Sequence, residues 1–495
     1  MKKAFLVLFF LCLIASTSIL VHSAEASSKT IVVPDDYPTI QIAITNASPG
    51  DTVFVRSGSY TGGIVIDKTI MLRGEAAKTT TVVGGATASD LGLTSVALRR
   101  TPETSFLLGR QFAVTYEEML TFNAQGESSK IRPANFIPPL TFGIIVNSNN
   151  VEISGFTIMG GDRAIYSSKG DGLLIQQNSL GTCILGGSNN TVANNSRIGL
   201  TIFGFHNLIA NNSGGLVLAS SNSSIIGNSL GGFALQNAYS NIIVNNTLSG
   251  SNMGLWIGSS ISSGPPTCSY NLFAGNKIEN CGLWGILMGA GAYNVFFGNI
   301  VENTGAGLDH DGYGLALGGN GVTAENNLFL HNIFKNNSKN FGVNWPVTGA
   351  NSFDDGKEGN YWDDYLTKYP NATEVNNSGT GSISYVLTEN NADNHPLLVQ
   401  PSISDKATPL PEPWASLLSE LITLPNPPPS LPSPSPSPSA SSSPLQTPIN
   451  SLSPSSTLSP SPSIPEFPSL ILAPTLMAAV LAGAIIFKNK QFKRN

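Results

Sequence analysis

The sequence predicts an all-β solenoid of the parallel β-helix class, and two repeating patterns support this prediction. An asparagine returns once per short apolar stretch through the middle of the chain, at intervals of 16 to 18 residues that later lengthen to as many as 33. In phase with it, a glycine is followed by an apolar residue, any residue and another apolar residue, as in Gly199–Ile202, Gly215–Leu218 and Gly232–Leu235. A fixed short period is typical of stacked structural units.

Each repeat is expected to contain two or three short strands. Period-two alternation over such short segments indicates strands, and no segment of the repeat region sustains the 3.6-residue period over the length that a helix needs. The repeating asparagine would lie at a bend, where it tolerates left-handed backbone dihedrals and can hydrogen-bond to its equivalent on the next rung. We therefore assign a structural ladder, with no catalytic role, to Asn178, Asn195, Asn212, Asn228, Asn246, Asn276, Asn299 and Asn332.

The third position of the glycine-led strand should face outward, because its apolar neighbours face the core. This outer column is itself apolar, and it consists of Thr201, Val217, Ala234, Trp256, Leu287 and Ala316. Three explanations are open. A partner protein covers the column, an irregular segment of this chain covers it, or Trp256 and Trp284 form a stacking platform for sugar rings.

Composition bounds the range of functions. The chain has 495 residues, 25 basic and 31 acidic side chains, and a net charge of −6, with no basic cluster before its last residues. Nucleic acid is therefore not an expected partner. Beyond the first residues there are three cysteines, an odd number without metal-ligand spacing. We expect them to be small buried residues, with a bridge between Cys268 and Cys281 as the alternative.

The two ends of the chain predict export and anchoring. Residues 1–26 have the charged, apolar and small-residue zones of a secretory signal peptide. The body, residues 27–400, is expected to be the β-helix. A Pro/Ser-rich linker, 401–464, would form an extended, disordered spacer. Residues 465–495 contain an uncharged stretch long enough for a transmembrane helix, followed by a basic tail expected to be cytoplasmic.

Two further features concern the surface of the body. Between residues 84 and 140 the repeat lapses into a long irregular excursion, with a short helix expected near Glu117, and such excursions from a solenoid commonly carry binding functions. Several Asn-x-Ser/Thr acceptor sites, together with the Pro/Ser spacer, are compatible with an exported glycoprotein. Each site alone is weak support, because an Asn- and Ser-rich repeat produces such triplets by chance.

Two segments carry a family resemblance. Thr30–Gln41, with Ala47–Val53, resembles the opening of pectin-lyase-like right-handed β-helices. Asn351–Gly356, Gly359–Tyr365 and Asp393–Leu398 resemble the closing region of NosD-type proteins, which share the repeat domain of carbohydrate-binding proteins and sugar hydrolases. The resemblance covers about residues 30 to 400 and implies a single-stranded right-handed parallel β-helix. It also implies that Trp362 closes the end of the core. It is far less specific for activity.

The tail carries a second resemblance. Pro465–Pro468, directly before the apolar stretch, is similar to the PEF-type sorting signals of archaeal surface proteins. This resemblance implies that a sortase-like membrane enzyme cuts there and transfers the body to a lipid. An uncut membrane anchor is the alternative, and both place the body on the outer face of the cell membrane.

Catalytic candidates come from the enzymes that share this fold. Those that cleave acidic sugars use clustered aspartates, or aspartate-bound calcium with a basic residue. Asp309 and Asp311 are one residue apart, so on a strand both carboxylates would point the same way and could hold calcium or act as an acid and base pair, with Arg163 as the basic group. The alternative is a polar loop between rungs.

Three functions follow from these features. The preferred one is a non-catalytic module, a carbohydrate-binding or adhesive rod displayed on a stalk, whose partner is an extracellular polysaccharide or cell-surface glycan and which requires no cofactor. The alternative is an anchored polysaccharide lyase or glycoside hydrolase. A further alternative is a NosD-like copper accessory protein. The histidines of this chain are expected on different rungs, without the Met or Cys cluster that Cu(I) prefers. The resemblance therefore implies the fold rather than copper binding.

Overall fold

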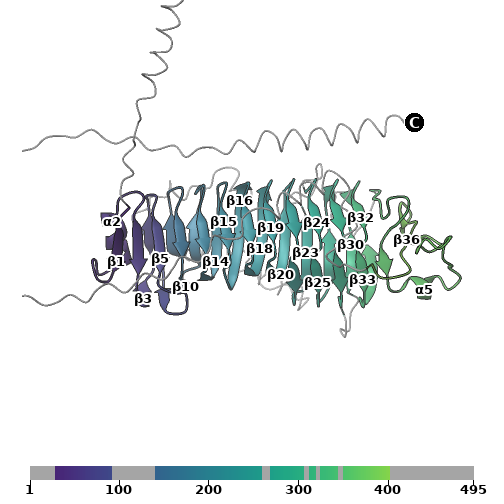
Figure 1. Ribbon diagram of the computed structural model, residues 1–495, viewed down its shortest axis with the longest axis horizontal. Coiled ribbons are helices and arrows are strands. Elements are labelled where there is room, and N and C mark those ends of the chain that lie inside the picture. Colours follow the sequence, from purple (N-terminus) through teal and green to yellow (C-terminus); the bar gives the residue numbers. More distant parts are fainter. Residues whose placement is uncertain are drawn as a thin grey trace, which may run out of the picture. The chain divides into compact units, whose positions relative to one another are not determined.

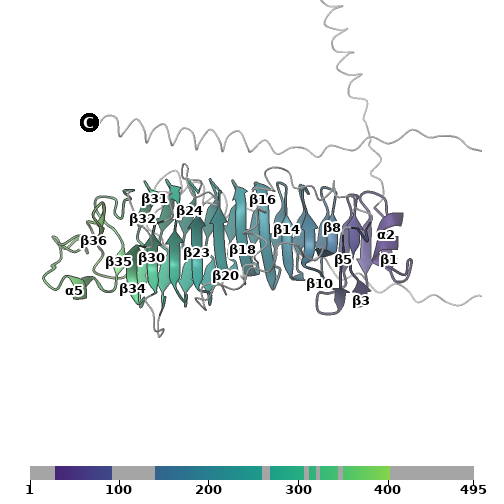
Figure 2. The same cartoon turned by 180° about the vertical axis from the view of Figure 1, so that it is seen from behind.

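Short strands and tight turns make up nearly all of the part of the chain that the structure describes. A computed structural model describes residues 28–87, 89–91, 140–258, 268–305, 312–318, 324–343 and 349–401. Over these residues the chain winds into a parallel β-helix with three faces (Figures 1 and 2). The predicted all-β parallel solenoid is therefore confirmed. The predicted signal peptide, linker and transmembrane helix, and most of the excursion, lie outside the described residues.

Face 1 is a sheet of twelve parallel strands with one strand from each rung. Most of its strands are only three residues long, because each must fit between two tight turns. In spatial order they are β1 (Thr30–Val33), β2 (Thr52–Val55), β5 (Met71–Gly74), β9 (Glu152–Ser154), β12 (Leu174–Gln176), β15 (Thr191–Ala193), β17 (Leu208–Ala210), β19 (Ser224–Ile226), β21 (Ile242–Val244), β24 (Leu272–Ala274), β28 (Val295–Phe297) and β32 (Leu328–Leu330).

Face 2 begins as a separate sheet and continues through the first residues of three long strands that turn the corner into face 3. The separate sheet contains β3 (Gly58–Thr61), β6 (Thr80–Val83), β10 (Thr157–Met159) and β13 (Ser179–Leu180). The long strands are β16 (Ile198–Phe205), β18 (Ser213–Ser221) and β20 (Ser229–Gln236). After them come β22 (Thr247–Ser249), β25 (Lys277–Glu279), β29 (Ile300–Glu302), β33 (Ile333–Lys335) and β35 (Tyr361–Trp362).

Face 3 carries the glycine-led strands that the sequence singled out. It starts with β4 (Ile64–Ile66), β8 (Thr141–Val146), β11 (Arg163–Ser167) and β14 (Thr182–Leu185). It continues through the remainder of β16, β18 and β20 to β23 (Met253–Gly258), β26 (Trp284–Met288), β30 (Tyr313–Leu317) and β34 (Lys339–Val343). A short antiparallel strand, β7 (Ala86–Thr87), pairs with β8 where the excursion begins. At the face 1 end of the later rungs, β27 (Gly291–Ala292) pairs with β31 (Ala324–Glu325).

The core is filled by columns of identical or similar side chains, because parallel strands in register place equivalent residues above one another. On face 1 the inward column runs through Ile175, Val192 and Ile209 to three phenylalanines, Phe273, Phe296 and Phe329, all at most 1% exposed. The three phenylalanine rings are stacked, with successive centroids 4.5 Å apart. These columns explain the apolar stretches seen in the sequence.

The eight ladder asparagines are buried and hydrogen-bonded in series. In each pair the side-chain Nδ2 donates to Oδ1 of the next asparagine at 2.9–3.1 Å, and the backbone N–H donates to the same oxygen. The series continues past Asn332 to Asn360 and ends on the carboxylate of Asp393. Each carboxamide also donates to a backbone carbonyl of the preceding rung, such as Asn246 to Ile225 at 2.9 Å. The ladder therefore satisfies the polar groups of a buried corner.

One part of the sequence interpretation was wrong, since the ladder asparagines do not adopt the left-handed conformation. That conformation falls on the residue directly before each of them, with φ between 55° and 63°. A left-handed residue projects its side chain out at the corner, whereas the ladder needs its carboxamide inside, so the two tasks belong to adjacent residues. The left-handed residues are Gln177, Asn194, Asn211, Gly227, Asn245, Gly275, Gly298 and His331.

A second ladder, absent from the sequence interpretation, runs along the corner between faces 3 and 1. Each backbone N–H donates to the side-chain oxygen of the next member, with one serine in place of an asparagine. From Asn241 onward the side-chain Nδ2 donates to the same oxygen, as in the first ladder. From Asn190 to Asn327 each member comes five residues before a member of the first ladder, as Asn207 precedes Asn212, because a three-residue strand of face 1 and one left-handed residue separate them. Its members are Asn190, Asn207, Ser223, Asn241, Asn271, Asn294, Asn327, Asn351 and Asn391.

Both ends of the stack are closed by other structure. At the first rung, α2 (Ile40–Asn46) buries Ile40, Ala43 and Ile44 on the core. This helix was not predicted, because its seven residues are too few for a periodic signal. At the last rung, α5 (Tyr365–Lys368) and the antiparallel pair β36 (Tyr385–Thr388) and β37 (Asn391–Asp393) form the cap (Figure 1). Trp362, expected to close the core, stacks between Phe334 and Tyr385 with centroids 4.4 and 4.5 Å away.

Candidate functional site

The proposed catalytic group is only partly described by the structure. Asp309 and Asp311 lie outside the described residues. Arg163 is half-buried at the start of β11, where its Nη1 donates to the backbone oxygen of Asp162 at 2.7 Å and burial lowers the pKa of the guanidinium. Seven strand pairings of face 3 separate β11 from β30, the strand that follows Asp311. At ~4.8 Å per pairing, the two strands are about 34 Å apart along the stack. Arg163 therefore belongs to a different part of the stack from that strand.

The apolar outer column of face 3 is a real column in the structure. Strand pairing places Thr201, Val217, Ala234, Trp256, Leu287 and Ala316 in one continuous register. The side chains on either side of Trp256 in the chain, Leu255 and Ile257, are buried in the core at 2% and 0% exposure, so Trp256 points away from it. The column thus points away from the core, although Ala234, Leu287 and Ala316 within it are themselves covered, at 4%, 7% and 1% exposure.

Three aromatic side chains gather around the later part of this column. Trp256, Trp284 and Tyr313 are partly buried and pack against a small apolar cluster that is separate from the core and contains Met253, Leu287 and Ala316. Trp284 lies between Met253 and Tyr313 in register on adjacent strands. We call these six residues the aromatic corner, since their strands begin at the corner between faces 2 and 3.

Two glycines allow the aromatic rings to lie against the sheet. A Cβ atom at Gly258 would collide with the indole of Trp256, and one at Gly342 would collide with the ring of Tyr313. Gly342 follows Ala316 in the outer column, so the Tyr313 ring lies over the next strand. The Nζ of Lys339 lies 5.7 Å from the centroid of the same ring. The rings of Trp256 and Tyr313 therefore lie close to the sheet and remain partly exposed.

A polar hollow adjoins the aromatic corner. Its volume is about 370 Å³, and it lies at the turns that lead from face 2 into β23 and β26. Carboxamides of three successive rungs contribute to its wall, and Trp284 follows the wall residue Gly282 by two positions. The residues that line it are Gly250, Ser251, Asn252, Asn280, Cys281, Gly282 and Asn303. Apolar rings beside uncharged donors and acceptors form a surface suited to a neutral, amphipathic ligand.

The described residues that flank the segment 306–311, which contains Asp309 and Asp311, lie on the same corner. Gly305 and Gly312 touch through their backbones, so that a Cβ on either would meet the other within 2.5 Å. Gly305 comes two residues after Asn303, which lines the hollow, and Gly312 directly precedes Tyr313 of the aromatic corner. The assignment of Asp309 and Asp311 as acid and base, or as calcium ligands, stays a prediction.

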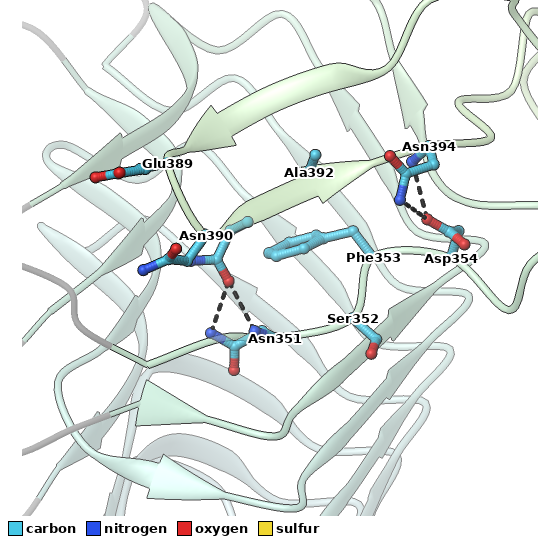
Figure 3. A pocket seen from close by; sticks show the side chains of 9 residues that line it. Asn351, Ser352, Phe353, Asp354, Glu389, Asn390, Ala392 and Asn394 are labelled. Atoms are coloured by element: carbon cyan, nitrogen blue, oxygen red, sulfur yellow. Dashed lines mark hydrogen bonds between the residues drawn. The ribbon is translucent and has the colours of Figure 1, made fainter. Parts of the chain in front are cut away.

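A second hollow, also of about 370 Å³, lies at the cap and is lined mainly by polar side chains (Figure 3). Its carboxylate Asp354 is fully engaged in the cap. It accepts hydrogen bonds from Gly356 N–H at 2.9 Å and from the backbone and side chain of Asn394 at 2.8 and 3.2 Å, and it lies 3.2 Å from His395 Nδ1. Asn351 in its wall donates to Asn391 as part of the second ladder. Asp354 and Asn351 in this hollow therefore have structural roles.

The cysteines and the acidic and histidine side chains show no assembled chemistry in the described ranges. Cys183, Cys268 and Cys281 are buried thiols, so the alternative of a Cys268–Cys281 bridge was wrong. Burial raises the pKa of Cys183 and of Cys281 to about 12. In the described part of the chain, no three His, Cys, Asp or Glu side chains gather as a metal ligand set. None of the helices described is long and apolar enough to cross a membrane, and the predicted span lies outside those residues.

Comparison with known proteins yields structural likenesses only. No protein-family model and no curated protein matches the chain. Among solved structures, the chain is similar to the Dettilon tailspike protein, with 14% identity over 67% of this chain and 66% of the tailspike and a TM-score of 0.42. It is also similar to a polygalacturonase from Erwinia carotovora ssp. carotovora, with 13% identity over 65% of this chain and 96% of that one and a TM-score of 0.38. The chain is similar as well to the catalytic domain of a GH87 alpha-1,3-glucanase, with 14% identity over 68% of this chain and 69% of that one and a TM-score of 0.36.

Proposed function

We propose that this protein is a non-catalytic carbohydrate-binding module and that the aromatic corner, together with the adjoining hollow, binds a neutral glycan. The observation that supports the proposal is the placement of Trp256, Trp284 and Tyr313 on the outside of face 3, where they add nothing to the core. The proposal rests on this surface and not on the structural likenesses.

The chemistry of the surface fits a sugar better than other ligands. An aromatic face takes up the apolar C–H face of a pyranose ring, and carboxamides and hydroxyls at its edge hydrogen-bond to the sugar hydroxyls. The hollow supplies such groups from Ser251, Asn252, Asn280 and Asn303 without a charged side chain in its lining. Successive rungs repeat at about 4.8 Å, so a polymer that runs along the stack meets similar groups at each rung.

Display at the cell surface is the second part of the proposal. It rests on the sequence patterns of residues 1–26, 401–464 and 465–495, which predict a signal peptide, a spacer and a membrane anchor that a sortase-like enzyme processes or leaves intact. A spacer would hold the β-helix away from the membrane, where it meets extracellular polysaccharides or cell-surface glycans. Fractionation of cells that produce the full chain, with detection of the body in the membrane and in the medium, tests this part.

The test of glycan binding compares the wild-type full-length chain with Trp256→Ala and Trp284→Ala on an array of neutral and acidic oligosaccharides. Each substitution is expected to weaken binding about tenfold, since the loss of an aromatic contact is worth roughly 1.5 kcal/mol. Phe205→Ala, which removes an exposed aromatic ring elsewhere on face 3, is the matched control and should bind as the wild type does. Unchanged binding by both tryptophan variants would refute the assignment of the site.

A second readout separates binding from turnover. Bound oligosaccharides are incubated with the protein, with and without calcium, and assayed for new reducing ends and unsaturated products. The proposal expects neither. Products that disappear in Asp309→Asn or Asp311→Asn would establish the alternative, an anchored lyase or glycoside hydrolase.

A further inference from the structure

A column of exposed tyrosines lies at the corner between faces 3 and 1, away from the aromatic corner. Tyr239, Tyr270 and Tyr293 come from three successive rungs and are 45%, 47% and 50% exposed. The rings of Tyr270 and Tyr293 are stacked, with centroids 5.1 Å apart and planes 6° from parallel. The phenolic hydroxyls of all three make no hydrogen bond to any described residue, and these tyrosines take no part in the proposed function.

The backbone under two of these tyrosines is unusual. Tyr270 and Tyr293 have φ values of 61° and 58°, in the left-handed region that a bulky side chain rarely adopts. They occupy the left-handed position that precedes the members of the second ladder from Asn190 to Asn327. On the other rungs this position is held by residues that are small or commonly tolerate it, namely Asn189, His206, Asn222, Ser240 and Asn326. Stability alone would favour asparagine at both places, so the tyrosines point to a function.

The stack has an open side. On the rung before Tyr270 the left-handed position is Ser240, whose side chain is too small to cover the tyrosine ring. Tyr239, next to Ser240, forms a backbone bridge with Ser269 and makes no ring contact with Tyr270. Among the described residues, therefore, no aromatic ring stacks on the face of Tyr270 that points toward Ser240. We call Tyr239, Tyr270 and Tyr293 the tyrosine column.

We infer that the tyrosine column is a second binding site for a neutral sugar ring, which extends the stack on the open face of Tyr270. Its neighbours along the corner are hydroxyl and carboxamide side chains, Asn222, Ser240 and Asn326, so the site offers uncharged hydrogen-bonding groups around a flat apolar face. A nucleic-acid base needs accompanying positive charge for its phosphate, which this corner and a chain of net charge −6 do not supply. The inference uses other residues than the proposed function and can fail independently of it.

The experiment measures binding and stability of the same variant. Full-length protein carrying Tyr270→Asn and Tyr293→Asn is compared with its parent, which keeps both tyrosines, on an array of neutral gluco-, galacto- and manno-oligosaccharides, with oligogalacturonides as the acidic comparison. Both proteins also carry Trp256→Ala and Trp284→Ala, so that any remaining binding comes from outside the aromatic corner. We expect neutral oligosaccharide binding to fall about five- to tenfold in the asparagine variant, with a thermal midpoint equal to or above that of its parent.

Each other outcome overturns the inference. Binding that is unaffected by the asparagine substitutions means that no sugar uses the column. A clearly lower thermal midpoint means that the tyrosines are structural. An elution volume that shifts from dimer to monomer on size exclusion, without a change in glycan binding, means that the column contacts a second copy of this chain. Loss of binding in the tryptophan variants alone would support the proposed function while removing this site.

Discussion

Replacement of one ladder asparagine tests whether the ladder holds the rungs together. Asn246 is 1% exposed and makes five side-chain hydrogen bonds. Its Oδ1 accepts from the backbone N–H and Nδ2 of Asn228, both at 2.9 Å. Its Nδ2 donates to the oxygens of Ile225 at 2.9 Å, Asn276 at 3.0 Å and Val244 at 3.1 Å. Asn246→Ala removes all five and leaves the Asn228 N–H buried without an acceptor.

The expected loss of stability follows from these contacts. A hydrogen bond contributes about 1 kcal/mol net to stability, and a buried donor left without an acceptor costs about 1–3 kcal/mol. Several groups that bond to Asn246 keep a second hydrogen-bond partner in the variant, so the five contributions do not simply add. Asn246→Ala should therefore lower the free energy of unfolding by about 3–5 kcal/mol. Urea denaturation followed by circular dichroism measures the loss. Amide hydrogen exchange should show that the rungs beside residue 246 open first, because each rung of a solenoid contacts only its neighbours.

The adjacent residue provides a matched control. Asn245 is exposed, has a φ of 55°, and lies in the position that Gly227 and Gly275 hold on neighbouring rungs. Asn245→Gly should change the free energy of unfolding by less than about 1 kcal/mol. If Asn246→Ala costs no more than Asn245→Gly, the buried ladder does not contribute as described, and strand pairing alone maintains the stack.

Three further predictions concern the cap, the aromatic corner and the thiols. Burial raises the pKa of Asp393 to about 6, so its protonation favours the folded state. The free energy of unfolding of the wild type relative to Asp393→Asn should therefore rise as the pH falls from 7 to 4, by up to about 3 kcal/mol, because carboxyls with lowered pKa values, such as Asp162, act alike in both proteins. Gly342→Ala should displace the Tyr313 ring and weaken glycan binding about two- to tenfold, measured by calorimetry, with a smaller effect on the thermal midpoint. Cys183 and Cys281 should resist iodoacetamide at pH 8 in the native protein, by mass spectrometry, and react fully in urea.

The sequence predicts the repeat architecture well because its signals are local. The residue after the left-handed residue is a buried asparagine, and the residues of the following strand alternate between inward apolar and outward positions. The spacing of these asparagines along the sequence therefore reveals the rungs. The second ladder carried a similar signal, an asparagine five residues before six of the eight members of the first ladder, as in Asn241 and Asn246. It was missed because Ser223 interrupts it and because only the asparagine that closes each apolar stretch was followed.

The sites are harder to predict than the rungs, because they depend on which residues the stack brings together. The outward register of Trp256 could be predicted from period-two alternation, and strand pairing places it there. The positions of Tyr313 and of the polar hollow beside the aromatic corner depend on turns whose lengths differ from rung to rung. The spacing of the repeats in the sequence does not predict how these turns fold. The tyrosine column could have been found by a search for the residue that precedes each second-ladder asparagine, where Tyr270 and Tyr293 depart from the pattern.

The first ladder has a direction. Every carboxamide directs one N–H to the amide oxygen of the following rung and its own oxygen to the preceding amide, while its second N–H turns back to a backbone carbonyl. The array of amide-to-amide hydrogen bonds therefore runs in one direction, with its donating, positive end at the last rung. The positive end of this array meets the Asp393 carboxylate, which partly offsets the effect of burial on that group. Every internal asparagine gives and accepts the same bonds, so duplication or loss of a whole rung leaves no carboxamide unmatched. The solenoid can thus change length during evolution while its two caps stay as they are.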